Sequence, residues 1–493
     1  MSSLPHKLYR AADVRELDRI AIEKFGIPGI DLMTRAGEAA FAALQFRWPA
    51  ARRIVVVCGA GNNGGDGFVL ARLAQLQGLA VSVVVTTSLE SLKGDAKLAY
   101  QSMVAAGVES QAITSELLAD ADVVVDALLG TGLDREVGGV LRDLIVEMNA
   151  ATAPVFAIDI PSGLNADSGI VMGEAINAAA TISFIGLKQG MLTGDGPAHC
   201  GDILFNDLDL PLAAYDKVAA AAERIEYDEL SALLPRRART THKGDCGHVL
   251  LIGGAPGMSG AVRMAGEAAL RCGAGLVTIA TAIEHAAIIN QARPELMVQG
   301  VNDVSDLRPL MKKADVIAIG PGLDQASWGM AMLDAALSAD VPLVVDADAL
   351  NLLAVEPHLR DDWVLTPHPG EAARLLNIST PEVQTERFSA IDKLQCKYGG
   401  VAVLKGSGTL VLDQDGALSL CDSGNPGMAS GGMGDVLTGV IAALIAQRLE
   451  LTAAAKLGVC LHASAADRAL VAGERGLLAS DLMPHLRKLV NGL

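Results

Sequence analysis

The stretch Gly424–Gly439 reads GNPGMASGGMGDVLTG and runs directly into the apolar segment Val436–Ala446. Glycines allow successive backbone N–H groups to converge on one anion, and the N-terminus of the following helix adds the positive end of its dipole. Asp435 would then lie beside a bound phosphoryl group, where a carboxylate can accept the proton of an attacking hydroxyl. The competing interpretation, a mobile glycine loop with Asp435 as an exposed N-cap, is less favoured because these features rarely coincide without a ligand.

Around this stretch, short apolar runs alternate with helical segments. The strands predicted in the second half of the chain are Val249–Ile252, Val277–Ala280, Val316–Ile319, Leu343–Val345, Trp363–Thr366 and Val401–Leu404. Near-continuous apolar runs are typical of parallel strands that are buried on both faces of a sheet. We therefore predict an α/β domain, and the absence of GxxxxGK[ST] excludes a P-loop enzyme.

The first half of the chain repeats the same alternation. Its predicted strands are Ile54–Cys58, Val81–Thr86, Val123–Leu128 and Val155–Ile160, preceded by predicted helices at Ala11–Lys24 and Asp31–Phe46. This order indicates a Rossmann-like α/β domain whose site lies at the carboxyl ends of the strands.

The length of 493 residues exceeds what one hydrophobic core usually serves, so two domains are expected. The segment Ala213–Leu234 is rich in alanine and charge and is bounded by Pro211 and Pro235. We place the linker near residue 220, which predicts a first domain at 1–220 and a second at 221–493.

Composition narrows the class of protein further. Hydrophobic residues make up 51% and charged residues 19% of the chain, which excludes general disorder. A net charge of −18 argues against nucleic acid or an anionic membrane as a partner. The seven cysteines form no CxxC pair, and the N-terminus shows no apolar signal segment, so a soluble cytoplasmic enzyme is expected.

Polar residues follow three predicted strands of the first half. The segment Cys58–Phe68 (CGAGNNGGDGF) departs from GxGxxG because asparagines and an aspartate lie inside the turn, and Asp126 and Asp159 end two further strands. These side chains should meet at one edge of the sheet. Amide and hydroxyl oxygens with a single carboxylate suit a large, weakly charged cation, so Asn63, Asp126 and Ser162 are predicted to hold K⁺.

In the second half, two predicted strands are followed by candidate binding residues. His368 lies between two prolines in WVLTPHPGE at Trp363–Glu371, which favours a ligand contact. Lys405 and the small residues after it, in VAVLKGSGT at Val401–Thr409, suit the phosphates and ribose of a nucleotide.

Two groups keep alternative interpretations at this point. Lys188 leaves an apolar segment, as either a functional residue or a surface lysine whose stem lies along the apolar surface. Asp346 and Asp348 follow a strand and would either orient the waters of Mg²⁺ or cap the next helix, so an indirect metal role is expected at most.

Taken together, NPGMASGGMGDVLTG, KGSGT and TPHPGE resemble the ribokinase-like superfamily. The HPGE segment and the glycine-rich loop narrow that resemblance to the NAD(P)H-hydrate dehydratases. In the first half, GNNGGDG, GTGL after Asp126 and DIPSGLNADSG at Asp159–Gly169 resemble the NAD(P)H-hydrate epimerases. The two resemblances cover nearly the whole chain and occur in the order of the bacterial fused enzyme.

The resemblance implies a substrate, NADH or NADPH hydrated across a nicotinamide double bond, which forms R and S epimers at ring carbon 6. The first domain would interconvert the epimers, and the second would restore the S form to NAD(P)H at the expense of ADP. K⁺ is expected at the epimerase site, Mg²⁺ at the dehydratase site, and a homo-oligomer as the assembly.

The resemblance also implies site residues. The hydrate in the first domain would be bound by Asn62, Asn63, Gly64, Gly65, Asp66, Gly130, Thr131, Gly132, Leu133, Asp134, Arg135, Glu136 and Asp159. In the second domain the hydrate would be bound by Ala261, Gly322, His368 and Asp435. The nucleotide would be bound by Lys405, Gly406, Ser407, Gly408, Thr409 and Gly434.

This chemistry is plausible for the residues themselves. Hydroxide is a poor leaving group, so the second site would first phosphorylate the hydroxyl, with Asp435 as base and Gly432–Gly434 binding the oxyanion. Epimerisation would proceed by reversible loss of water, with Asp159 as the first choice for proton transfer and Lys188 as the second. The alternatives are a vitamin-precursor kinase in the second half and a non-catalytic nucleotide-binding module in the first.

Overall fold

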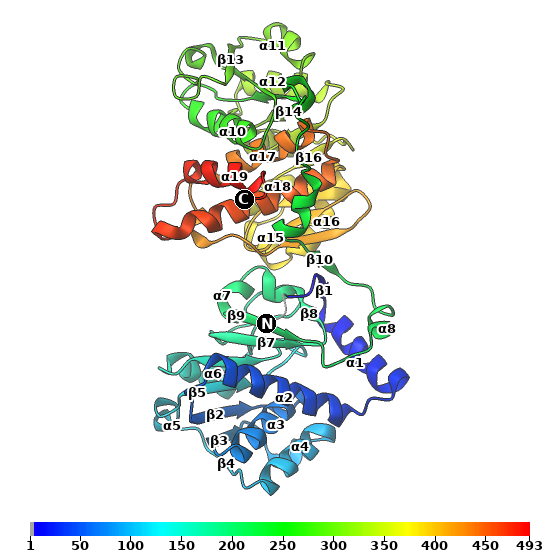
Figure 1. Cartoon of the computed structure of the whole chain (residues 1–493), viewed down its shortest axis with the longest axis vertical. Helices are drawn as coiled ribbons and strands as arrows, with labels where there is room; N and C mark the ends of the chain where they lie inside the picture. Colours follow the sequence, from blue (N-terminus) through cyan, green and yellow to red (C-terminus); the bar gives the residue numbers. More distant parts are fainter. Residues whose placement is uncertain (1–3) are drawn as a thin grey trace. The chain divides into compact units, whose positions relative to one another are not determined.

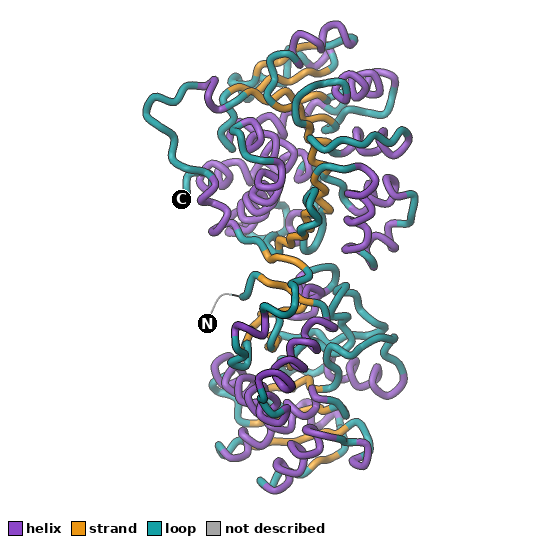
Figure 2. Tube along the Cα trace, turned by 90° about the vertical axis from the view of Figure 1, so that its right-hand side faces the viewer, coloured by secondary structure: helices purple, strands orange, loops and turns teal. Residues whose placement is uncertain are grey.

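The computed structural model describes residues 4–493 and divides into two compact units, Met1–Glu223 and Arg224–Leu493. Each unit has its own sheet with helices on both faces, as Figures 1 and 2 show. The predicted α/β class is therefore confirmed. Among residues 4–493, no helix combines the length and apolarity that a membrane span requires.

The first unit is built on a seven-stranded parallel sheet in the order β4-β3-β2-β5-β6-β7-β9. The strands are β2 (Arg53–Cys58), β3 (Ala80–Val85), β4 (Ser110–Gln111), β5 (Val123–Ala127), β6 (Val155–Ile158), β7 (Ala180–Phe184) and β9 (Asp202–Asn206). All residues of β5, β6 and β7 are buried, as expected for central parallel strands. The four predicted strands are present, within two residues at each end.

Helices cover both faces of this sheet. They are α1 (Ala11–Phe25), α2 (Gly29–Arg47), α3 (Asn62–Leu76), α4 (Gly94–Ala105), α5 (Ser115–Ala119), α6 (Gly139–Ala150), α7 (Gly196–Cys200) and α8 (Leu212–Tyr215). The apolar sides of α1 to α4 share one core, and those of α5 and α6 belong to a second core. At the edge of the unit, β1 (Lys7–Tyr9) pairs in parallel with β8 (Leu187–Lys188) and antiparallel with β10 (Ala222–Arg224).

The second unit is built on nine strands in the order β13-β12-β11-β14-β15-β16-β17-β18-β19. They are β11 (His248–Ile252), β12 (Leu276–Thr281), β13 (Met297–Gly300), β14 (Val316–Ile319), β15 (Leu343–Val345), β16 (Trp363–Leu365), β17 (Val401–Leu404), β18 (Thr409–Leu412) and β19 (Leu418–Cys421). Pairing is parallel as far as β17 and antiparallel from β17 to β19. The six predicted strands are present, and β13, β18 and β19 are additions.

Two groups of helices enclose the sheet of the second unit, as seen edge-on in Figure 2. The helices are α9 (Tyr227–Leu230), α10 (Ser259–Arg271), α11 (Val304–Met311), α12 (Ser327–Leu337), α13 (Ala347–Val355), α14 (Pro369–Leu376), α15 (Thr380–Thr385), α16 (Arg387–Tyr398), α17 (Met433–Ala446), α18 (Leu451–Ala469) and α19 (Met483–Leu489). Helix α17 is buried along nearly its whole length between α10 and α18, so the core holds the helix that starts at the glycine-rich loop.

The contact between α10 and α17 depends on Gly439. A Cβ at this position would lie 2.0 Å from the backbone oxygen of Ala265, which a helix cannot move independently. We predict that Gly439→Ala lowers the free energy of unfolding by about 1–3 kcal/mol, the usual cost of overpacking. Chemical denaturation of the full chain measures this change.

Gly260→Ala in α10 is the matched control, because a Cβ there would meet no atom within 4 Å. Alanine is a better helix former than glycine, so this control should be neutral or stabilising. Equal unfolding midpoints for the two variants would contradict the close approach.

Candidate active sites

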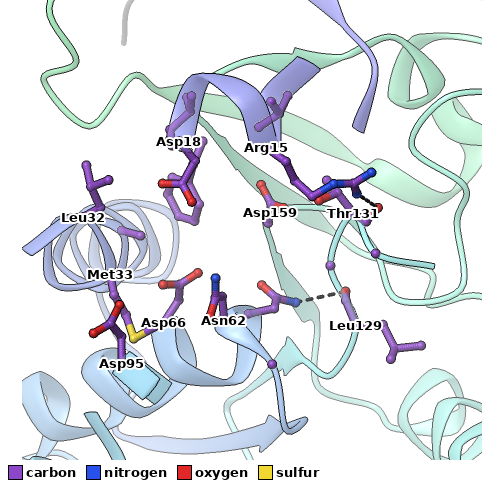
Figure 3. Close-up of a pocket in the computed structure, with 18 of the residues that line it drawn as sticks. Arg15, Asp18, Leu32, Met33, Asn62, Asp66, Asp95, Leu129, Thr131 and Asp159 are labelled. Carbon is purple, nitrogen blue, oxygen red and sulfur yellow. Dashed lines mark hydrogen bonds between the residues drawn. The ribbon is translucent and has the colours of Figure 1, made fainter. Parts of the chain in front are cut away.

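A cavity of about 780 Å³ opens in the first unit where β2, β5 and β6 end (Figure 3). Of the residues predicted to bind the hydrate there, its lining contains Asn62, Asn63, Asp66, Gly130, Thr131, Gly132, Leu133, Asp134, Arg135 and Asp159. Helices α1 and α2 close the other side through residues such as Asp18 and Met33. The structure therefore brings together segments from three strand ends, as parallel topology requires.

Gly64, Gly65 and Glu136 are absent from the cavity lining. The predicted polar loop is in fact the first turn of α3, and its glycines serve packing. A Cβ on Gly64 would lie 2.1 Å from the backbone oxygen of Gly59, and one on Gly65 would lie 2.5 Å from Met33 Sδ. These glycines let α3 approach the loop after β2 and helix α2.

Asp159 and Lys188 form a buried ion pair beside the cavity. Lys188 is fully buried, and its Nζ donates to Asp159 Oδ1, to Ser183 Oγ at 3.0 Å and to the Phe184 oxygen at 3.1 Å. The interpretation of Lys188 as a surface lysine is wrong, because its three protons all meet acceptors inside the protein. The other oxygen of Asp159 faces Gly130, where a Cβ would lie 3.6 Å away.

The backbone holds Asp159 in an unusual conformation. Its φ of 68° lies in the left-handed region, which a residue with a side chain adopts at an energetic cost. Its N–H donates to the Ile182 oxygen on the neighbouring strand at 2.7 Å, which maintains this geometry. Such strain is concentrated at functional sites, where it aims a side chain that ordinary strand geometry would turn elsewhere.

Two further carboxyl groups share the space in front of Asp159 (Figure 3). Burial, together with the charges of Asp159 and Asp18, raises the pKa of Asp66 well above its usual value. Burial and the charges of Asp159 and Asp95 likewise raise the pKa of Asp18. Close carboxyl groups that resist ionisation can hold protons near neutral pH, as an acid catalyst must.

Sequence reasoning missed the contribution of α1 to this site. Asp18 lies in the cavity wall, and Arg15 Nη1 donates to the backbone oxygen of Thr131 at 3.0 Å. An amphipathic helix with charged residues gives no sign that its polar side faces a cavity, so no signal in the sequence pointed to them.

The three residues predicted to hold K⁺ lie together at the cavity, whose lining includes Asn63. Both oxygens of the fully buried Asp126 accept from Ser162, from its N–H at 2.8 Å and its Oγ at 2.6 Å. Asn63 Nδ2 donates to the Leu129 oxygen at 3.0 Å, and Ser162 Oγ lies 3.3 Å from the same oxygen. Burial still raises the pKa of Asp126 to about 6.

One oxygen in this cluster has no donor. Asn63 Oδ1 is buried and accepts no hydrogen bond from any residue within 4–493. A buried acceptor without a partner is costly, and a buried carboxylate without a countercharge is costlier still. A monovalent cation would satisfy both, so the residues fit K⁺.

In the second unit, the site is organised around Lys405. Its Nζ lies 2.7 Å from Asp346 Oδ1 and 3.8 Å from Glu371 Oε2, and Thr438 Oγ1 donates to Asp346 Oδ2 at 2.9 Å. Burial alone would raise the pKa of Asp346, but Lys405 and these hydrogen bonds hold it below its usual value. A Cβ on Gly434 would lie 3.1 Å from Lys405 Nζ, so the lysine, the acid and the glycine-rich loop converge.

Asp435 occupies the first turn of α17 and is not its cap. The N-cap is Gly432, with a left-handed φ of 93°, so the N-cap interpretation of Asp435 is wrong. Burial, with the nearby charge of Asp346, raises the pKa of Asp435 to about 6 against the opposing effect of Lys405. Asp435 accepts no hydrogen bond from any residue within 4–493, so its carboxylate is available to a ligand.

The structure also gives the surroundings of the other residues predicted to bind the hydrate in the second unit. Ala261 and Gly322 lie side by side, since a Cβ on Gly322 would be 3.4 Å from Ala261 Cβ. His368 caps α14. Its ring Nδ1 accepts from the Gly370 N–H at 2.9 Å, and its backbone N–H donates to Glu371 Oε2 at 2.7 Å. Its Nε2 lies 3.4 Å from Glu371 Oε1.

The segment Lys405–Gly408 is held from behind by a buried arginine that the sequence did not reveal. Arg387 is 2% exposed and donates to the backbone oxygens of Gly408 at 3.0 Å and of Lys405 at 3.4 Å. The left-handed φ values of Gly406 (133°) and Gly408 (65°) let the chain turn around this guanidinium. The conformation of the KGSGT segment therefore depends on Arg387 of α16, a helix that precedes the segment in the chain.

His462 is a second residue that the sequence did not reveal. It is buried on α18, its Nε2 has no partner within residues 4–493, and burial lowers its pKa to about 4.

The acids after β15 do not form a metal cage. Asp346 is engaged by Lys405 and Thr438, and Asp348 accepts from the N–H of Asp324 at 2.9 Å. Within residues 4–493, no group of three or more His, Cys, Asp or Glu side chains is arranged to hold a metal ion.

Comparison with known proteins agrees with this division into two sites. The family model described as NAD(P)H-hydrate dehydratase matches residues 249–488, and that described as YjeF-related protein N-terminus matches residues 29–190. The bifunctional NAD(P)H-hydrate repair enzyme Nnr of Coxiella burnetii is 52% identical over 485 residues, which cover 98% of this chain and 99% of the relative.

Solved structures resemble the second unit. The ADP/ATP-dependent NAD(P)H-hydrate dehydratase of Bacillus subtilis is 30% identical with a TM-score of 0.50, covering 56% of this chain and 99% of its own. A ribokinase-like superfamily protein of Enterococcus faecalis is 29% identical with a TM-score of 0.50, covering 55% and 95%. The predicted ribokinase-like class of the second unit is thus confirmed, and the chain belongs to the family of bifunctional NAD(P)H-hydrate repair enzymes.

Proposed function

We propose that the first unit interconverts the R and S forms of hydrated NADH and NADPH, and that the second unit dehydrates the S form at the expense of ADP. The dehydratase assignment is carried by Asp435, whose carboxylate accepts no hydrogen bond within residues 4–493 and lies with Lys405 at the glycine-rich loop. The epimerase assignment is supported by the cavity in front of the Asp159–Lys188 ion pair.

In the second unit, the hydroxyl on ring carbon 6 attacks the β-phosphorus of ADP, Asp435 accepts its proton, and AMP leaves. Lys405 and the N–H groups of Gly432–Gly434 bind the phosphoryl oxygens while charge builds up. The carbon–oxygen bond of the new phosphate ester then breaks, assisted by the electron pair of the ring nitrogen. Loss of a proton from ring carbon 5 restores the double bond.

Lys405 can serve this reaction because it is not sealed in the protein. Its side chain is 19% exposed, whereas Asp346 behind it is 2% exposed. Asp346 and Glu371 raise the pKa of Lys405 against the effect of burial, so the ammonium stays charged. One side of that charge is paired, and the other is directed to the loop where phosphates would bind.

In the first unit, we propose that Asp159 exchanges the proton when the hydroxyl leaves as water and returns to the opposite face. The ring nitrogen supplies the electrons that expel the hydroxyl. Lys188 positions Asp159 by holding one carboxylate oxygen, which leaves the other free toward Gly130. The raised pKa values of Asp66 and Asp18 favour a proton reservoir in the same cavity.

The remaining assignments concern ions, location and assembly. Asn63, Asp126 and Ser162 would hold K⁺, which would neutralise the buried carboxylate under the substrate loop. Mg²⁺ would enter the second site with the nucleotide, as supported by the solved relative crystallised with ATP and Mg²⁺. We place the protein in the cytoplasm, supported by seven free thiols, and propose a homo-oligomer, supported by strongly exposed apolar side chains such as Val471 and Val355.

Racemic hydrate with ADP tests both halves together. Absorbance of reduced nicotinamide should recover from both epimers, because the R form is converted to the S form that the second unit consumes. Recovery that stops near half of the racemate, under conditions where spontaneous epimerisation is slow, would refute the epimerase assignment.

Asp435→Asn tests the base. We predict that dehydration falls by roughly 10²–10⁴-fold, the usual value of general-base catalysis, while ADP affinity changes little. Because the base must be ionised and burial raises its pKa to about 6, the wild-type rate should rise with pH through about 6. The variant should lose this dependence, and epimerisation should persist. Near-normal turnover in the variant would mean that Asp435 has no catalytic role.

Asp126→Ala and removal of K⁺ test the cation cluster. Both changes should slow epimerisation, because the segment that bears Gly130 and Thr131 loses its anchor, and they should leave repair of the S form intact. Replacing K⁺ by a large organic cation should have little further effect on the variant. Equal loss of both activities would show that the change acts on the whole protein.

A further inference from the structure

A second cavity, of about 960 Å³, opens in the second unit away from Lys405 and Asp435. Gln447, at the end of α17, and Gly273, after α10, line it. Since a helix rises about 1.5 Å per residue, Gln447 lies roughly 18 Å from Asp435 along α17. The cavity is therefore separate from the site where ADP is proposed to react.

The cavity is basic in a protein with a net charge of −18. All its cationic side chains are arginines, namely Arg236, Arg237, Arg271, Arg293 and Arg487, and its acidic ones are Glu267 and Glu295. Guanidinium groups match phosphate and carboxylate oxygens in a bidentate manner, which an ammonium cannot do. The lining is typical of a site for an anion.

The protein neutralises only part of this charge. Arg271 Nη2 and Arg293 Nη2 both contact the same oxygen of Glu267, and the Nε of Arg293 is buried without a partner. The exposed guanidinium groups of Arg236 and Arg487 have no hydrogen-bond or ion-pair partner among residues 4–493. Buried donors are normally hydrogen-bonded within a fold, so the Nε of Arg293 indicates an acceptor that residues 4–493 do not supply.

Apolar side chains complete the walls. Leu234, Leu270, Leu489 and Val490 line the same cavity, so its occupant would have an apolar or ring-containing part besides its anionic group. The volume falls in the range of small-molecule sites. One arginine is already oriented, because Arg237 donates to Gln447 Oε1 at 2.7 Å and to the Gly273 oxygen.

We propose that this arginine-lined cavity binds an organic phosphate of nucleotide size, as a second nucleotide site besides that of the reaction. The phosphate meets Arg236 and Arg487, whose guanidinium groups have no partner in the described part of the chain, and the ring lies against the leucines. Two other occupants fit the cavity less well. Inorganic phosphate would leave the apolar wall uncovered, and a second copy of the chain would have to supply an anionic group of its own.

The test is equilibrium dialysis of the full chain with radiolabelled ADP. The Arg236→Gln/Arg487→Gln variant should lose one equivalent of bound ADP, or bind that equivalent at least about tenfold more weakly, since hydrogen bonds to charged groups are removed. Arg142→Gln/Arg308→Gln, at exposed arginines outside the cavity, is the matched control and should bind as the wild type does. ADP should also slow amide exchange at residues 231–237 in the wild type.

Recovery of NADH from its S hydrate should be equal in all three proteins, which separates this proposal from the proposed function. Equal binding of ADP by the three proteins would overturn the proposal. If an equal concentration of inorganic phosphate displaced the extra equivalent of ADP, the claim that the occupant is an organic phosphate would be wrong. A change of assembly size in the double variant would show instead that the cavity is a contact between copies.

Discussion

Lys405 is the residue on which the second site depends. Its ammonium joins three segments that are far apart in sequence, the end of β15 through Asp346, the start of α14 through Glu371 and the glycine-rich loop through Gly434. A buried carboxylate such as Asp346 is stable only with a countercharge, so the ion pair fixes where the lysine lies. The same cluster sets the pKa of Asp435, the proposed base, because burial and the neighbouring carboxylates raise it while Lys405 limits the rise.

The first unit also contains a lysine–aspartate pair, Lys188 with Asp159, but the roles of the two side chains are exchanged. Lys188 is fully enclosed and gives its three protons to protein acceptors, whereas Lys405 keeps part of its surface open. In the first unit the carboxylate of Asp159 is the partly exposed member of the pair and the lysine supports it. In the other the lysine is exposed and the carboxylate is its support. This inversion favours the proton transfer proposed for the first site and the phosphate binding proposed for the second.

Much of the fold was predictable from the sequence because parallel strands buried on both faces carry an almost uninterrupted apolar signal. The hairpin β18–β19 was not predicted, since its antiparallel strands are four residues each and carry no comparable run. The burial of Lys188 was equally hidden. It depends on the pairing of β8 with β1, where Lys188 lies beside Tyr9, a contact between segments almost 180 residues apart. Local patterns carry no information about such a partner.

The glycine motifs show a related limit of prediction from sequence, because the role of each glycine depends on its neighbours in the fold. Glycines in both motifs were predicted to bind ligands, yet Gly64 and Gly65 are required for close packing, and a Cβ on Gly434 would crowd Lys405 Nζ at 3.1 Å. Glycines of a motif can therefore serve packing, and that close packing brings the polar residues of the motif into position. For that reason the acids and amides within the motifs, such as Asn63 and Asp435, identify the chemistry more directly than the glycines that make the motifs recognisable.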